Sequence, residues 1–376
     1  MKENISILAL ALGLGCGRAT SSYDVHVYAE GTSLDELSTD TSLKNGVIEY
    51  ARFRMWGRKL GLGITGLYGD TPYISSTQFV LSSAKFGYPA HPSFDTQSFF
   101  ISPNTTVDTC YSIIGPRSEA SSTDYVDVGD SIRLRGETVD VSLQRDPTNY
   151  PRPAGEIWYV GYSAGLGPVL QNYAHGKDTW PTSATTLQVI TQGGLPPEDS
   201  MIPAIPYGFI GELGIPASLE NIAINGTSLD ANSEAFTWAD SLQFTWTPST
   251  NSGVVQIAIR YLGTGSAQDD CSCDEDCGED LTCVDGGCMA TEGSSDHQLA
   301  ELVCTVADDG NFTLTSSMLP SDLTNIDAQG WLLLLSRMEQ KEITAPDIIS
   351  HNRKRLQNYG IRTRGIDTVV TRLEKP

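Results

Sequence analysis

The sequence of 376 residues lacks the features that mark several large classes of protein. Beyond its first 15 residues it contains no long apolar run, and the run at 331–335 covers only five residues. A membrane-spanning helix needs about 20 apolar residues, so no later transmembrane helix is expected. Basic residues are also few: 24 Lys and Arg stand against 46 Asp and Glu, which leaves a net charge of −22. Such a surface repels phosphate backbones, so nucleic acid is not an expected partner.

Histidine is scarce as well. The five histidines, His26, His91, His175, His297 and His351, show none of the spacings at which metal ligands recur. We therefore expect no metal and no other cofactor. The chain also lacks the alternation of strands and helices that builds a parallel α/β fold.

The sequence does contain a series of short strand patterns. Residues 23–28 alternate polar and apolar side chains, as a half-buried strand does. Residues 299–306 and 312–316 flank a strong hairpin turn, Asp-Asp-Gly-Asn at 308–311. Short strands at intervals of about 8–12 residues, joined by polar turns, are typical of β-sandwiches. The expected fold class is therefore all-β.

A segment rich in proline and glycine, residues 193–216, divides the chain. Because these residues mark turns and linkers, we place the main domain boundary within it. The expected organisation is two β-sandwich domains, residues 23–203 and 204–339, followed by a C-terminal tail, residues 340–376.

The tail is basic. From Arg337 to Pro376 the chain has nine basic and five acidic residues, a balance of +4. Since opposite charges within one chain tend to pair, this segment is expected to pack on the acidic body. The alternative is a docking arm for an anionic surface.

The N-terminus has the pattern of an export signal. Residues 5–14 form an almost unbroken apolar run, too short to span a bilayer, and we assign residues 1–15 to a signal peptide. The small residues before Cys16 resemble the bacterial lipobox, in which the Cys is acylated with palmitate and becomes the mature N-terminus. Gly13 departs from that pattern, which prefers Leu at this position. Residues 16–22 would then be a lipid-anchored tether, and simple cleaved secretion is the alternative.

The residue after Cys16 bears on the compartment. By resemblance to lipoproteins of this type, an Asp there would indicate retention at the inner membrane, whereas this chain has Gly17. The expected location is therefore the outer membrane or cell surface of a two-membraned bacterium.

Five cysteines fall within eighteen residues, in an insert that covers residues 269–290: Cys271, Cys273, Cys277, Cys283 and Cys288. The insert has almost no apolar residues, so covalent links must hold it together. Behind an export signal we expect disulfides, whereas in a reducing compartment the same residues would form a thiolate zinc site. The acidic residues between the cysteines do not complete a calcium loop of the EF-hand type.

The cysteine count is informative about pairing. Eight cysteines minus an acylated Cys16 leave seven, an odd number. We expect two disulfides within the segment from Cys273 to Cys288 and a third between Cys271 and Cys304. Cys110 would then be the unpaired thiol, buried in the core. The sequence by itself leaves the connectivity open.

One short motif raises an enzymatic alternative. Residues 161–165, Gly-Tyr-Ser-Ala-Gly, match the nucleophile elbow of α/β-hydrolases and follow a strand-like segment. A helix must follow such an elbow, but residues 166–168, Leu-Gly-Pro, interrupt it. We therefore interpret the motif as a turn, and a secreted serine hydrolase that uses Ser163 is the alternative function.

Two segments resemble a module of exported myxobacterial-type lipoproteins: residues 244–248, Phe-Thr-Trp-Thr-Pro, and residues 304–314, Cys-Thr-Val-Ala-Asp-Asp-Gly-Asn-Phe-Thr-Leu. The resemblance covers residues 219–337 and implies an immunoglobulin-like β-sandwich. The segment from Cys277 to Cys288 resembles small disulfide knots inserted in the same kind of protein. The resemblance implies no activity, because such sandwiches host unrelated functions.

The expected function is that of a non-enzymatic cell-surface lipoprotein with a binding or structural role. Its lipid anchor would hold it to a membrane, and a protein or glycan ligand would bind at surface loops such as the insert. A self-assembling surface subunit is a further alternative. Several aromatic residues are expected in the core, with stacking on sugars as the alternative: Trp158, Tyr159, Tyr162, Tyr173 and Trp180.

Overall fold

The structure is a computed structural model, which describes the strands of the protein and some of the turns that join them. The described part of the chain contains no α-helix, which confirms the prediction of an all-β fold. The described residues are 24–28, 44–55, 78–91, 107, 109–114, 124–145, 158–161, 180–181, 183–194, 205, 207–229, 236–237, 241–249, 253–261, 281–284, 287–290, 300–315, 318, 331–345, 348–349, 355–356 and 359–374.

The described residues contain 23 strands. In chain order they are β1 (Asp24–Tyr28), β2 (Lys44–Met55), β3 (Gln78–His91), β4 (Thr109–Ile114), β5 (Asp124–Tyr125), β6 (Ser131–Arg135), β7 (Asp140–Arg145), β8 (Trp158–Gly161), β9 (Thr185–Thr191), β10 (Gly208–Ile215), β11 (Ala223–Ile224), β12 (Thr227–Ser228), β13 (Phe236–Thr237), β14 (Ser241–Thr245), β15 (Val254–Tyr261), β16 (Leu281–Val284), β17 (Gly287–Ala290), β18 (Ala300–Ala307), β19 (Asn311–Thr315), β20 (Trp331–Ala345), β21 (Ile348–Ile349), β22 (Arg355–Leu356) and β23 (Tyr359–Glu374).

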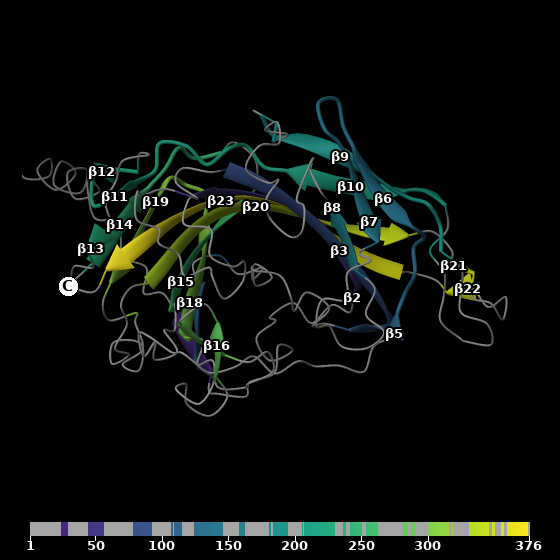
Figure 1. Cartoon of the computed structure of the whole chain (residues 1–376). Coiled ribbons are helices and arrows are strands. Elements are labelled where there is room, and N and C mark those ends of the chain that lie inside the picture. The colour runs from purple at the N-terminus through teal and green to yellow at the C-terminus, as the bar shows by residue number, and fades with distance from the viewer. Residues whose placement is uncertain are drawn as a thin grey trace, which may run out of the picture.

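One sheet of 15 strands holds most of these elements, and its long central strands cross the molecule in Figure 1. Its order is β1-β4-β18-β15-β20-β23-β2-β3-β8-β7-β6-β9-β10, with β13 beside β23 and β5 beside β3. The sheet therefore includes strands from both of the predicted sandwich domains. Three smaller sheets have the orders β12-β11-β14-β19, β16-β17 and β21-β22.

The segment 340–376 differs from the predicted tail. β20 extends to Ala345, and β23 pairs antiparallel with β20 and parallel with β2, in the middle of the large sheet. Every residue from Ile361 to Val370 is buried. Its buried residues include Arg362, Thr363, Arg364, Asp367 and Thr368 as well as apolar ones, so the segment lacked the alternation of buried apolar and exposed polar residues by which the other strands were recognised.

Two arginines of this segment are buried and paired with acids, as the prediction of intramolecular charge pairing requires. Arg364 Nη1 lies 3.1 Å from Glu49 Oε1 on β2, and Arg362 Nη2 lies 3.6 Å from Glu342 Oε1 on β20. Each pair joins residues that face each other across the ladder. The positive charges of Arg362 and Arg364 are thus met by the two neighbouring strands.

Two apolar cores lie on one face of the central strands. Ile361 of β23 belongs to the first core, whereas Val369 and Leu373 of the same strand belong to the second. These residues share a face because side chains alternate along a strand with period two. Residues of the first core precede Leu219 in the sequence and residues of the second core follow Ile215, with the exceptions of Ile361 in the first core and Cys110 in the second.

The first core is formed mainly by the strands from β2 to β10 and comprises Ile48, Tyr50, Val80, Ala84, Phe86, Val126, Val128, Ile132, Leu134, Val139, Val141, Leu143, Tyr159, Trp180, Leu187, Val189, Ile205, Ile210, Leu213, Ile215 and Ile361. The second core lies between the large sheet and the sheet β12-β11-β14-β19. It comprises Cys110, Leu219, Ile222, Ile224, Leu229, Leu242, Phe244, Trp246, Val255, Ile257, Ile259, Leu302, Cys304, Val306, Phe312, Leu314, Leu333, Leu335, Val369 and Leu373.

The large sheet curls so that β10, its last strand, packs across β20 and β23. The two backbones come very close where Gly365 of β23 meets Gly214 of β10, since a Cβ atom on Gly365 would clash with the Gly214 carbonyl oxygen. Nearby, the hydroxyl of Thr363 donates a hydrogen bond to the Glu212 carbonyl oxygen, at 2.9 Å. Glycine at position 365 thus allows the crossing.

We predict that Gly365→Ala destabilises the protein by at least the ~1–3 kcal/mol typical of overpacking, because backbone atoms cannot move aside as side chains can. The matched control is Gly136→Ala, whose new Cβ would lie 2.6 Å from Leu187 Cδ2, the end of a flexible side chain. Urea unfolding of both variants measures the difference. Equal losses in the two variants would contradict the close approach of β10 and β23.

Candidate functional site: a buried charge network and the cysteine positions

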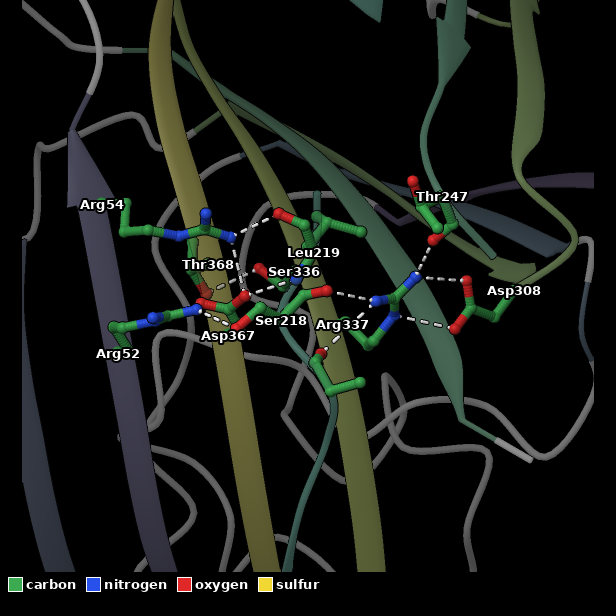
Figure 2. Close-up of polar contacts among 11 residues, drawn as sticks. Arg52, Arg54, Ser218, Leu219, Thr247, Asp308, Ser336, Arg337, Asp367 and Thr368 are labelled. Atoms are coloured by element: carbon green, nitrogen blue, oxygen red, sulfur yellow. Dashed lines mark hydrogen bonds and ion pairs between the residues drawn. The ribbon is translucent and has the colours of Figure 1, made fainter. Parts of the chain in front are cut away.

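The carboxylate of Asp367 occupies the boundary between the two cores on β23. Its side chain is fully buried. Oδ1 accepts a hydrogen bond from Arg52 Nε at 2.8 Å, and Oδ2 accepts one from Arg54 Nη2 at 2.7 Å. The backbone N–H of Leu219 also donates to Oδ2, at 2.7 Å (Figure 2). Both oxygens are therefore engaged, as burial of a carboxylate requires.

The register of the sheet places these charges together. Arg52 of β2 and Arg337 of β20 both face Asp367 directly, on opposite sides of β23. Arg54 is two residues further along β2 and so shares the face of Arg52. Charged residues from three different strands thus become neighbours through strand pairing.

The same arginines hold the connector that joins β10 to β11. Arg54 Nη2 donates to the Leu219 carbonyl oxygen at 2.6 Å, and Arg52 Nη2 donates to Ser218 Oγ at 2.8 Å. Arg337 Nη1 donates to the Ser218 carbonyl oxygen at 2.7 Å. Figure 2 shows these side chains converging on the connector from β2 and β20. The backbone that passes from one core to the other is fixed by guanidinium groups.

Arg337 extends the network into the second core. Its Nη2 donates to Asp308 Oδ1 at 2.9 Å and to the Thr247 carbonyl oxygen. Its Nε lies 2.8 Å from Asp308 Oδ2, an ion pair too oblique for a hydrogen bond. Asp308 Oδ1 also accepts a hydrogen bond from Trp246 Nε1, at 2.8 Å. The arginine thus connects β20 with the turn after β18 and with the end of β14.

The electrostatics of the network favour structural rigidity. Burial lowers the pKa of the Arg54 guanidinium, and the nearby Asp367 carboxylate opposes this shift. Arg52 lies over the ring of Trp180, with its Cζ 5.1 Å from the ring centroid. Three guanidinium groups face two carboxylates, and backbone carbonyl oxygens and Ser218 Oγ accept further hydrogen bonds from them. Arg54 Nε is buried and has no hydrogen-bond partner among the described residues. The carboxylates of Asp367 and Asp308 already accept hydrogen bonds from groups of the protein, so the arrangement is suited to holding the connector in place.

A smaller polar group lies at the edge of the first core. The hydroxyl of Tyr159 accepts a hydrogen bond from the Val128 N–H at 2.9 Å and donates to Asp127 Oδ1 at 3.1 Å. Arg145 Nη1 lies 2.8 Å from Asp127 Oδ2. Burial raises the pKa of the Tyr159 phenol. Tyr159 and Trp180 are buried in the first core, which confirms for these two the core position expected from the sequence.

The structure corrects the expected pairing of Cys304. Cys304 forms a disulfide with Cys110 and not with Cys271, and the Cα atoms of the pair are 3.9 Å apart. β18 pairs antiparallel with β4, and this register places the two cysteines directly opposite each other. Cys110 is fully buried, as predicted, but it is not an unpaired thiol. The sequence could not reveal a partner 194 residues away.

The other predicted cysteines are placed only in part. Cys283 lies in β16 and Cys288 in β17, and they face each other in the register of that hairpin. Cys16, Cys271, Cys273 and Cys277 lie outside the described residues. The acylation of Cys16 and the disulfides within the segment from Cys273 to Cys288 therefore stay predictions, whereas Cys271 has lost its predicted partner, Cys304.

Ser163 of the hydrolase alternative also lies outside the described residues. The strand that precedes it, β8, ends at Gly161 and pairs antiparallel with both β3 and β7. The nucleophile elbow of an α/β-hydrolase follows a strand of a mostly parallel sheet. The surroundings of the motif thus differ from those of the hydrolase elbow.

Two searches of the described part of the chain concern ligands and membranes. No group of three His, Cys, Asp or Glu side chains among these residues is arranged to hold a metal ion. None of these residues belongs to a helix long and apolar enough to cross a membrane.

Comparison with known proteins adds little to this description. No protein-family model matches the chain, and no curated protein matches it. Among solved structures, the chain aligns with the collagen adhesin CNA from S. aureus at 5% identity and a TM-score of 0.09, over 92% of this chain and 97% of that one. A likeness this low carries no argument about fold or function.

We predict that Asp367→Asn destabilises the protein by roughly 3–5 kcal/mol, because it leaves buried arginines without their countercharge. Asp140→Asn is the matched control, since Asp140 pairs with Arg133 at the surface and a surface ion pair contributes little. Urea unfolding gives both values. If the two variants lose the same stability, Asp367 does not organise the network.

We also predict a contribution of Tyr159 to the alkaline stability of the fold. Because its pKa is raised in the folded state, the stabilisation is complete below the unfolded tyrosine value of about 10 and is lost as pH rises above it. The free energy of unfolding of Tyr159→Phe should therefore fall less steeply above that pH than that of the wild type. Tyr207→Phe, which alters a ring that is 80% exposed, should follow the wild type. Parallel curves for the wild type and Tyr159→Phe would contradict this assignment.

Proposed function

We propose that the protein is an exported, non-enzymatic cell-surface lipoprotein, anchored through Cys16, that presents its cysteine-rich insert to a protein or glycan ligand. In this proposal residues 204–339 are an immunoglobulin-like sandwich that serves as the scaffold. The observation that carries the proposal is the buried disulfide between Cys110 and Cys304.

That disulfide supports export. Disulfides form and persist in oxidising compartments and are rare in the cytosol. The bond joins β4 to β18, two strands that already pair in the large sheet, and both sulfur positions are buried in the second core. It is therefore well protected from reducing agents and suits a protein that works outside the cell.

The topology of the sheet supports a display role. β1 begins at Asp24, level with Thr109 of β4, which in turn is level with Thr305 of β18. The insert instead leaves the sheet between Tyr261, the last residue of β15, and Ala300, the first of β18. Asp24 and the root of the insert are thus separated by five residues along β18, about 16 Å. β1 runs from the anchored end toward the insert.

The rigidity of the scaffold fits the same role. Binding loops work best when a stiff framework positions them. Here both cores share β23, and the network around Asp367 fixes the connector between them. A ligand at the insert would be held at a defined place relative to the anchor.

The proposal predicts that cells fed an alkyne analogue of palmitate incorporate it into the wild-type protein and not into Cys16→Ala. Protease added to intact cells should release the protein from the surface. The matched control is Cys110→Ala, because the sulfur of Cys110 is buried in the wild type and its removal should not affect labelling. Recovery of an unlabelled cytoplasmic protein that retains Met1 would contradict the proposal.

A further inference from the structure

The hairpin β16–β17 brings two cysteines of the insert to facing positions. Its register pairs Leu281 with Ala290, Thr282 with Met289, Cys283 with Cys288 and Val284 with Gly287. Two residues, Asp and Gly at 285–286, separate the strands in the sequence. Asp-Gly is a preferred pair for a two-residue hairpin loop.

The position of this cysteine pair in the hairpin matters for its chemistry. In a two-residue hairpin the closing residues, here Val284 and Gly287, exchange backbone hydrogen bonds. The next pair, Cys283 and Cys288, therefore occupies a non-hydrogen-bonded site, where facing Cα atoms lie about 4.5 Å apart. That separation falls within the range that a disulfide spans.

The chain already contains a disulfide of this kind. Cys110 and Cys304 also face each other on neighbouring antiparallel strands, and they are bonded. This protein therefore joins one pair of cysteines at directly opposed strand positions. Cys283 and Cys288 stand in the same relation in their own ladder.

The hairpin also needs a covalent link. β16 and β17 form a sheet of their own, and no other described strand pairs with either of them. A two-stranded hairpin of four residues a strand is at best marginally stable in water. Since the insert has few apolar residues to bury, a cross-strand bond is the available source of stability.

We infer that Cys283 and Cys288 form a disulfide that closes this hairpin. The inference rests on the proposed export. When the disulfide between Cys283 and Cys288 forms, two electrons and two protons leave the two thiols. The electron acceptor is the disulfide of an exported thiol-oxidising protein, which becomes a dithiol.

This pairing determines where the odd sulfur lies. Five cysteines belong to the insert, and the disulfide between Cys283 and Cys288 uses two of them. Cys304 is already bonded to Cys110, so it cannot accept a partner from the insert. The sulfur without a partner inside the insert is therefore one of Cys271, Cys273 and Cys277, and never Cys283 or Cys288.

The sequence allows a direct test by mass spectrometry. Cleavage before aspartate separates residues 280–284, which contain only Cys283, from residues 285–295, which contain only Cys288. Whole cells that produce the protein are treated with N-ethylmaleimide, and the protein is purified and digested without reduction. We expect these two peptides to appear as one disulfide-linked species, together with the linked peptides of Cys110 and Cys304.

Two variants sharpen the test. Cys283→Ser should abolish the linked species and leave Cys288 alkylated, whereas Cys277→Ser should retain it. If Cys110 and Cys304 are linked but Cys283 is alkylated or bonded elsewhere, the inference fails and the proposed export stands. If Cys110 and Cys304 are alkylated as well, the proposed export fails too.

Discussion

The structure depends on the burial of one charge, the carboxylate of Asp367. An ionised carboxylate removed from water costs several kcal/mol unless charged and polar donors replace its hydration. Here the replacement comes from Arg52, Arg54 and the N–H of Leu219, which belong to β2 and to the connector. The carboxylate is satisfied only when β2, β23 and the connector are all in place. The junction of the two cores therefore depends on three segments that are far apart in the sequence.

This dependence gives the C-terminal strand a central role. β23 contributes to both cores and lies between β2 and β20. Arg52 and Asp367 are 315 positions apart in the sequence, so their contact forms only when β23 has come to lie beside β2. Contacts of this separation form late, since chain entropy must be lost before they form.

The scaffold and the insert are held by different forces. The large sheet is stabilised by two apolar cores, buried ion pairs and the disulfide between Cys110 and Cys304. The hairpin β16–β17 pairs with no other strand among the described residues and has little to bury. Sequence changes in the hairpin therefore need not disturb the packing of the large sheet. Loops positioned by a rigid scaffold in this way commonly differ more in sequence than the scaffold itself.

The sequence by itself determined the local features of this protein. The period-two patterns and polar turns indicated an all-β fold, and the turn at residues 308–311 was predicted from its residues. The hairpin expected around that turn was wrong, because β18 pairs with β4 and β15 in the large sheet, whereas β19 pairs with β14 in another sheet. The excess of opposite charges indicated internal pairing, which Arg364 and Glu49 confirm. Only the tertiary structure decided the place of β23, the partner of Cys304 and the network around Asp367. Strand register between distant segments is set by packing over the whole sheet, and a strand buried on both faces leaves no alternation in the sequence to reveal it.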